Sequence, residues 1–313
     1  MTMVRMVVIA AFAFGAPAFC ASSRTVSPVV LPFAIEEIYG KRPVVAVRLN
    51  DHPFKMVIHS NAGFSAQLPH DVARRAAVSI VRHSGDFGIE GPGKVSVLGR
   101  DEGVLPRLQV GSRTYSDVAV SVFETPGEQS TGMLGLDWIA ARRLVIDYPR
   151  HRIVLDSSAK DGIRLRRTLV GQGYRAIPMR RNADGRYTVA VTLEATTRPM
   201  TVSTVAGLTI DQTFARAAGV ELGVVINDDY GPRGAKVSTY ATRRPITLTI
   251  GPWRSTPIAD AGVLDNAAYM SKPRSPEDGN GGMLGADFLI ANRAVVDFGS
   301  GVLYLRRPGH SSP

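Results

Sequence analysis

The sequence contains one unit twice, and this duplication constrains the fold more than any other feature. Four segments recur in the same order, and within them short apolar motifs such as Val-Ala-Val and Gly-Met-Leu-Gly are repeated. The matching pairs are residues 45–49 with 189–193, 62–65 with 206–209, 132–139 with 282–289, and 144–148 with 294–298. Four ordered matches are hard to obtain by chance, so we infer a tandem duplication of one structural unit.

Each unit has the pattern of a β protein. Apolar runs rich in β-branched residues predict short strands, and 31 glycines with 20 prolines predict many turns. The strands are expected at 44–49, 118–123, 152–155, 187–193, 246–250 and 302–305. Short helices are expected at 71–76 and 213–218, and two more with Asp137 and Asp287 as their N-caps. The sequence therefore predicts an all-β fold.

The first 21 residues have the pattern of a secretory signal peptide. Arg5 is followed by the apolar run 6–14 and by small residues that suit cleavage. Cys20, the sole cysteine, lies beside the cleavage position, and Phe19 before it argues against a lipid anchor. We therefore expect a periplasmic or extracellular protein, and no later apolar run is long enough for stable membrane insertion.

The rest of the chain divides at a polar and basic stretch. We expect a first unit at 25–156, a linker at 157–184, a second unit at 185–307 and a tail at 308–313. Each unit is long enough to bury a core of its own.

Composition and spacing exclude several kinds of ligand. The chain has 37 Lys and Arg against 27 Asp and Glu, a net charge of +10 that favours acidic partners without indicating nucleic acid. The spacing of His52, His59, His70 and His83 fits no metal-binding motif, and no dinucleotide, P-loop or serine-hydrolase fingerprint is present. No cofactor, metal or nucleic acid is predicted.

The order of these features resembles the aspartic peptidase clan. The chain is similar to bacterial retropepsin-like proteins and, because two units are fused, to bilobal pepsin-like proteases. The resemblance covers about residues 30–156 and 185–306, and it rests on the paired Met-Leu-Gly segments, Gly111 and Gly251, and the Ile-Asp-Tyr and Val-Asp-Phe strands. It implies a bilobal fold with a central active site and a monomer, since one chain supplies both halves.

The catalytic positions that the resemblance implies are substituted in both units. Asp-Thr-Gly is expected in each, but the chain reads His59-Ser60-Asn61 and Ser203-Thr204-Val205. A pair of adjacent carboxylates shares one proton and so supplies both a base and an acid. A serine hydroxyl does not titrate in the accessible pH range and cannot replace either carboxylate.

We expect structural roles for the residues next to the two substituted catalytic positions. We expect the hydroxyls of Ser60 and Thr204 to hydrogen-bond backbone groups. Val205 disfavours the backbone angles that glycine adopts, so the second loop is expected to depart from the family's shape. The repeated acids Asp137 with Asp287 and Asp147 with Asp297 suggest caps and salt bridges rather than a replacement dyad.

These substitutions predict a pseudoprotease that binds peptide or protein in the cleft between its lobes. Two glycine-rich hairpins, at 85–93 and 228–234, correspond to the family's flaps; the candidate cleft residues on them are Phe87, Gly88, Gly91, Tyr230 and Gly231. Two alternatives stay open. One is a hydrolase in which His59 activates Ser203 as nucleophile, and the other is a structural or assembly partner.

Overall fold

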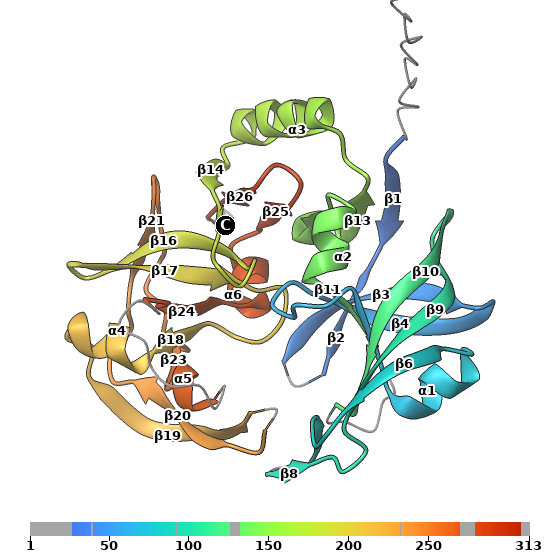
Figure 1. Ribbon diagram of the computed structural model, residues 1–313. Coiled ribbons are helices and arrows are strands. Elements are labelled where there is room, and N and C mark those ends of the chain that lie inside the picture. The colour runs from blue at the N-terminus through green and yellow to red at the C-terminus, as the bar shows by residue number, and fades with distance from the viewer. Residues whose placement is uncertain are drawn as a thin grey trace, which may run out of the picture.

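The computed structural model describes residues 27–38, 40–91, 93–125, 132–231, 233–269 and 279–307. The predicted signal peptide with Cys20 and the predicted tail at 308–313 lie outside these residues. Strands dominate the described part, and they form two lobes on either side of a shared central sheet (Figure 1). The predicted all-β, bilobal fold is therefore confirmed.

The N-terminal lobe is an eight-stranded sheet that curls because β3 pairs with both β4 and β9. Its strands, in spatial order, are β2 (Ala34–Glu37), β3 (Lys41–Leu49), β4 (His52–His59), β11 (Gly132–Gly135), β5 (Ala66–Leu68), β10 (Arg113–Val122), β9 (Arg100–Val110) and β6 (Ser79–Ser84). The lobe also contains helices α1 (His70–Arg75) and α2 (Leu136–Ala141) and the small hairpin of β7 (Ile89–Gly91) and β8 (Lys94–Val95).

The C-terminal lobe repeats this topology. Its strands are β19 (Leu222–Tyr230), β20 (Lys236–Thr242), β23 (Gly262–Leu264), β18 (Thr209–Asp211), β24 (Gly282–Leu284), β17 (Thr196–Val202), β16 (Tyr187–Leu193), β21 (Leu248–Ile250), β22 (Trp253–Arg254) and β15 (Arg180–Arg181). Helices α4 (Gln212–Ala217), α5 (Asn266–Tyr269) and α6 (Ala286–Ala291) complete it. The parallel pairs β4–β11 and β5–β10 recur as β17–β24 and β18–β23, so the sequence repeat is also a topological repeat.

A six-stranded sheet joins the lobes. Its order is β1 (Val29–Pro32), β13 (Arg152–Leu155), β12 (Val145–Asp147), β25 (Val295–Asp297), β26 (Val302–Leu305) and β14 (Arg175–Pro178). At its centre the equivalent strands β12 and β25 pair antiparallel, with Ile146 opposite Val296. The two repeats are therefore related by a local twofold axis through this pair of strands.

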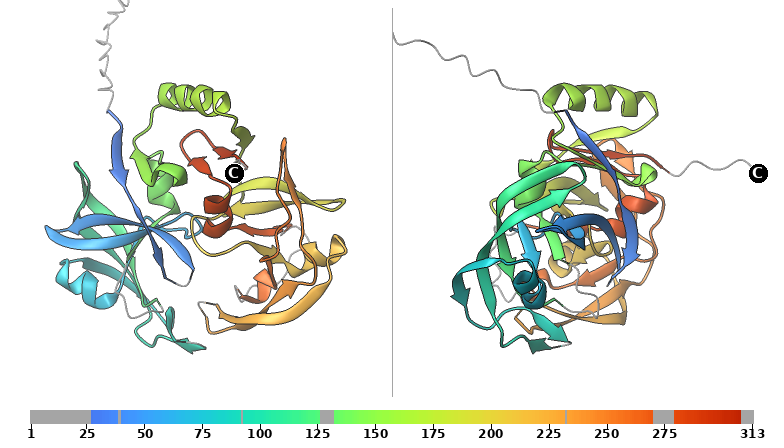
Figure 2. Two further views of the ribbon diagram at one scale, coloured as in Figure 1. Left: turned by 180° about the vertical axis from the view of Figure 1, so that it is seen from behind. Right: turned by 90° about the vertical axis from the view of Figure 1, so that its right-hand side faces the viewer.

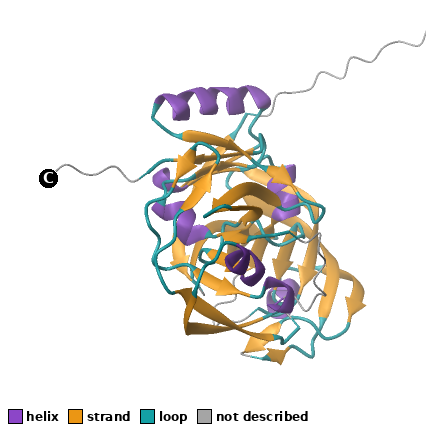
Figure 3. Cartoon of the chain, turned by 90° about the vertical axis from the view of Figure 1, so that its left-hand side faces the viewer, coloured by secondary structure: helices purple, strands orange, loops and turns teal. Residues whose placement is uncertain are grey.

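Residues 157–184, predicted to be a linker, include a helix, α3 (Ala159–Gly171), and strand β14. The Ser158 hydroxyl accepts a hydrogen bond from the Asp161 backbone and the Asp161 carboxylate accepts one from the Ser158 backbone, a capping box that starts the helix. Leu169 is buried with Tyr174 and Tyr304 against the central sheet, while basic side chains of the helix are exposed. Figures 2 and 3 show the helix lying across the end of the molecule beside this sheet. This helix covers one face of the central sheet.

The aspartates predicted to be N-caps are not caps. Helices α2 and α6 begin after Gly135 and Gly285, whose backbone is extended, and no side chain caps either helix. Asp137 and Asp287 lie in the first turn instead, where a carboxylate interacts favourably with the helix dipole. The other repeated pair is buried: Asp147 pairs with Arg150 and Arg152, and Asp297 accepts a hydrogen bond from the Ser300 backbone.

Candidate functional site

The two loops that the resemblance marks as catalytic lie side by side at the junction of the lobes. Each follows a strand, β4 in the first repeat and β17 in the second, and each packs against the glycine that ends a Met-Leu-Gly segment. A Cβ on Gly135 would lie 2.1 Å from the Phe64 carbonyl oxygen, and one on Gly285 would lie 2.2 Å from that of Gly207. The repeated motif is therefore required for the loops to approach the helices that follow.

Ser60 and Thr204 join the loops through a reciprocal set of hydrogen bonds. The Ser60 N–H donates to Thr204 Oγ1 at 2.9 Å, and the Thr204 N–H donates to Ser60 Oγ at 3.0 Å. The Thr204 hydroxyl donates to the Ile58 carbonyl at 2.6 Å, and the Ser60 hydroxyl to that of Val202 at 3.0 Å. Both side chains are buried. The predicted bonding of these hydroxyls to backbone groups is confirmed, and all four bonds cross between the lobes.

His59 is held as a neutral imidazole. Burial, with the nearby charges of Arg42 and Arg186 adding to its effect, lowers the pKa of His59 to about 3. Its Nδ1 is buried and has no hydrogen-bond partner among the described residues. A neutral ring at this position carries no charge at physiological pH, unlike the shared-proton carboxylate pair of an aspartic protease.

Ser203 is buried and its hydroxyl is engaged within its own loop. The hydroxyl donates to the Val205 carbonyl at 3.0 Å and accepts a weaker bond of 3.4 Å from the Val205 N–H. In the described part of the chain no hydrogen bond joins Ser203 to the His59 ring. The Ser203 hydroxyl is therefore oriented toward Val205 and not toward a base.

Val205 occupies a position where the resemblance implies glycine, and its side chain packs across the lobe junction. It is buried with Val44 and Val57, which belong to β3 and β4 of the other lobe. The loop keeps Val205 out of the left-handed region and places Ala206 there instead, at φ +64°. Asn61, its counterpart, reaches the other lobe through a 3.0 Å contact from its side-chain nitrogen to Met283 Sδ.

The hairpins predicted as flaps meet tip to tip. A Cβ on Gly93 would lie 3.4 Å from the Tyr230 ring, and one on Gly234 would lie 3.0 Å from Val95 Cγ2. The hairpin β7–β8 of one lobe and the hairpin β19–β20 of the other therefore touch, and both lie at the bottom of Figure 1.

The predicted cleft residues do not all lie at this contact. Phe87 packs edge-on against Phe123 with ring centroids 5.0 Å apart, and Gly88 lies against the Glu124 backbone, so both anchor the base of the first hairpin. A Cβ on Gly91 would meet no atom within 4 Å. Gly231 packs on the Tyr269 carbonyl, which leaves Tyr230 as the predicted residue nearest the other lobe.

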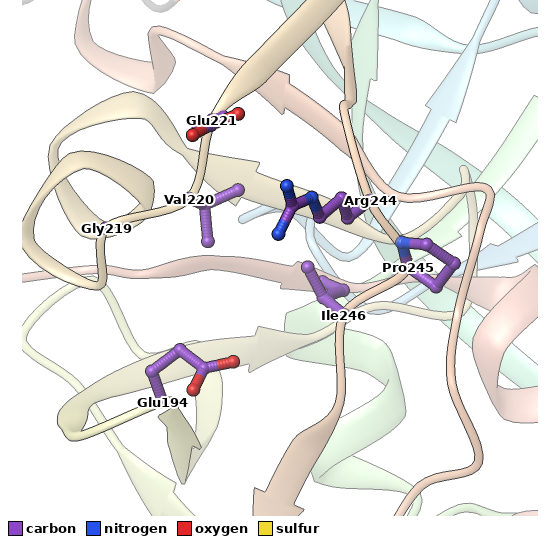
Figure 4. A pocket seen from close by; sticks show the side chains of 7 residues that line it. All are labelled: Glu194, Gly219, Val220, Glu221, Arg244, Pro245 and Ile246. Carbon is purple, nitrogen blue, oxygen red and sulfur yellow. The ribbon is translucent and has the colours of Figure 1, made fainter.

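A small cavity of about 200 Å³ lies in the C-terminal lobe, and Figure 4 shows the residues that line it. Its lining mixes both charges with apolar groups and comprises Glu194, Gly219, Val220, Glu221, Arg244, Pro245 and Ile246. None of the predicted site residues is among them. Ligand pockets usually span 300–1,000 Å³, so this cavity is not the candidate site.

The described residues were also compared with the requirements of a metal site and of a membrane-spanning helix. No group of three or more His, Cys, Asp and Glu side chains in this part of the chain is placed to hold a metal ion. Among the same residues, no helix has the length and apolar character needed to cross a membrane.

Comparisons with solved structures identify the fold. An aspartic proteinase from Irpex lacteus matches with a TM-score of 0.50 at 10% sequence identity, over 91% of this chain and 99% of that one. Basic 7S globulin from soybean matches at 0.44 and 12% identity, over 90% and 95% of the two chains. A retropepsin-like aspartic protease from Rickettsia conorii matches at 0.28 and 13% identity, over 41% of this chain and 90% of its own.

No protein-family model matches the sequence, and no curated protein matches it either. The match to the Irpex lacteus enzyme shows the bilobal fold of pepsin-like aspartic proteases over 91% of this chain.

Proposed function

We propose that this protein is a secreted pseudoprotease, which binds a polypeptide segment between its lobes without cleaving it. The observation that carries the proposal is the content of the two central loops: a neutral His59 and a buried Ser203 stand where the fold places its carboxylate pair. General acid-base catalysis contributes 10²–10⁴ in rate per group, and two carboxylates that share a proton act as one unit.

The retained architecture supports binding rather than loss of all function. The hydrogen bonds between Ser60 and Thr204 and the packing of Val205 keep the lobes in a fixed relation. The two hairpins that meet at Gly93 and Tyr230 offer backbone groups to an extended peptide, which adds to strands through main-chain hydrogen bonds that need no catalytic residue. The signal-peptide pattern at 1–21 supports export.

The experiment that tests binding between the lobes is a reversible lock on the hairpins. Val95→Cys with Gly234→Cys places two thiols where a Cβ on Gly234 lies 3.0 Å from Val95 Cγ2, which suits a disulfide. Cys20→Ser is included so that no other thiol competes. We expect the oxidised variant to bind pooled random hexapeptides at least about tenfold more weakly, a loss of about 1.4 kcal/mol, and reduction to restore binding.

The single variant Val95→Cys, treated identically, is the control and should bind as the unsubstituted chain does. Fluorescence anisotropy with labelled peptides gives both affinities. Equal binding by the oxidised and reduced double variant would show that peptides do not enter between the hairpins, and would refute the proposed site.

A further inference from the structure

The internal repeat places a pair of arginines beside the two central loops. Arg42 precedes Val44–Val47 in β3 as Arg186 precedes Thr188–Val191 in β16, with the same offset of 144 that relates the central loops. Val44 in β3 lies opposite Val57 in β4. Arg42 precedes Val44 by the same number of residues as His59 follows Val57, so the register places Arg42 beside His59. In the second repeat Thr188 lies opposite Thr201, and the same register places Arg186 beside Ser203.

Each arginine belongs to one lobe and lies near the loop of the other. Arg186 Nε donates to the Asn61 carbonyl at 3.2 Å, so this guanidinium from the C-terminal lobe contacts the loop that contains His59. Arg42 Nε donates to the Ile38 carbonyl in the turn before β3, and a Cβ on Gly40 in that turn would lie 3.8 Å from Ala206 Cα. Both arginines are partly exposed.

The charges of both arginines reach the centre of the junction. Arg42 and Arg186 each contribute to lowering the pKa of His59, after burial as the main cause. Arg42 also acts on Tyr269: burial first and Asp229 second raise the pKa of Tyr269, and Arg42 opposes them. Because Gly231 packs on the Tyr269 backbone, Arg42 is near both a central loop and the base of the second hairpin.

Among the described residues, three carboxylates lie beside the centre: those of Asp184, Asp287 and, next to Tyr269, Asp229. Asp184 pairs with Arg186 Nη1 at 3.0 Å, and Asp287 pairs with Lys41 at 3.6 Å. The two positions that hold carboxylates in a working aspartic protease are His59 and Ser203. The substitution therefore removes two carboxylates from a centre that Arg42 and Arg186 flank, and both guanidinium groups already take part in other contacts. A guanidinium donates charge-assisted hydrogen bonds to a carboxylate, and these bonds are stronger than bonds between neutral groups.

We propose that Arg42 and Arg186 form a carboxylate-recognition site at the lobe junction, so that the polypeptide bound there is one with an acidic group over His59. This inference rests on the proposed function and specifies its ligand. The net charge of +10 favours the same ligands, because it attracts acidic peptides over a longer range.

The test compares two pools of random hexapeptides, one with Glu and the other with Gln fixed at the third position, both blocked at their termini. At 0.15 M salt we expect the unsubstituted chain to bind the Glu pool at least about tenfold more tightly, as charge-assisted bonds of about 1.5–3 kcal/mol require. In the double variant Arg42→Gln with Arg186→Gln, the preference for the Glu pool should fall to less than about twofold. Long-range attraction by the remaining positive charge accounts for that small preference. A third pool with Gln and a free C-terminal carboxylate distinguishes a terminal from a side-chain acid.

Two further variants make the result specific. Arg164→Gln with Arg243→Gln removes two exposed arginines far from the junction, whose side chains are 79% and 71% exposed, and should keep the tenfold preference. Arg42→Lys with Arg186→Lys keeps both charges but loses the planar guanidinium groups and some of their N–H donors, and should retain only part of the preference. Thermal unfolding verifies that each variant is folded.

The outcomes separate this inference from the proposed function. If both pools bind the unsubstituted chain equally well, the protein binds peptides but the acidic preference is refuted. A preference that survives in the double Gln variant, or that disappears equally in the distant control, assigns it to overall charge and also refutes the site. If no pool binds a folded chain, the proposed function itself is wrong.

Discussion

Replacing Thr204 with valine is expected to lower the free energy of unfolding by about 3 kcal/mol, with no change in side-chain shape. The hydroxyl accepts a bond from the Ser60 N–H and donates one to the Ile58 carbonyl, and both partners are buried. Valine leaves them without a partner, and each unsatisfied buried group costs about 1–3 kcal/mol. Chemical denaturation measures the change.

Thr204→Ser is the matched control, since it keeps the hydroxyl and loses only a methyl group. It should cost less than half as much as valine. Ser60→Ala removes the reciprocal partner, so the double variant with Thr204→Val should be less destabilised than the sum of the two single variants. Strict additivity, or equal stability of the valine and serine variants, would contradict the hydrogen bonds described between the lobes.

Acid should destabilise the protein through His59. The folded chain keeps this ring neutral down to about pH 3, whereas in the unfolded chain it binds a proton below its ordinary pKa of 6.5. The unfolded state therefore gains protons as the pH falls from 6.5, and stability falls with it. Between pH 7 and pH 4.5 the contribution of His59 should decrease by about 2–3 kcal/mol, at about 1.36 kcal/mol for each pH unit.

The measurement is the difference in unfolding free energy between the unsubstituted chain and His59→Gln across this range. Glutamine stays neutral, so the variant should lose less stability in acid. His52→Gln, a substitution of an exposed histidine seven residues away, is measured alongside as the matched variant. Parallel curves for the unsubstituted chain and His59→Gln would contradict the burial of a neutral ring. NMR of the His59 ring should show no protonation at pH 4.5.

The duplication predicted two equivalent β units, and the resemblance to aspartic peptidases predicted that they form a bilobal fold. The same parallel and antiparallel strand pairs occur in both lobes. Gly111 and Gly251 both turn a pair of strands at positive φ, as their place between predicted strands suggested. Local patterns sufficed here because a repeated unit has to bury the same apolar faces twice.

Other features depended on contacts that a local pattern does not contain. Val205 was predicted to disturb its loop. Its packing on Val44 and Val57 could not be predicted, because the sequence does not show which strands face it across the junction. Helix α3 was missed because an exposed helix carries the same polar and basic residues as a linker, although Ser158 and Asp161 gave a capping signal. The start of α2 was predicted too late because its N-cap position is held by Gly135, which has no side chain to cap the helix and so gives no capping signal in the sequence.

The arginine pair at the junction could have been found from the sequence. Arg42 and Arg186 have the same offset as the segments that revealed the duplication, but both lie just outside those apolar segments. Their significance emerges only with strand register, which places each beside a substituted catalytic position.

The central claim is that the lobes bind polypeptide without hydrolysing it, and a digest with pooled peptides tests it most directly. The purified chain is incubated with random peptides at pH 4 and pH 7, and mass spectrometry of the products is compared with that of the chain carrying Ser203→Ala. We expect intact peptides at both pH values, with acidic peptides retained on the protein. New peptide termini that disappear with pepstatin, or with Ser203→Ala, would contradict it.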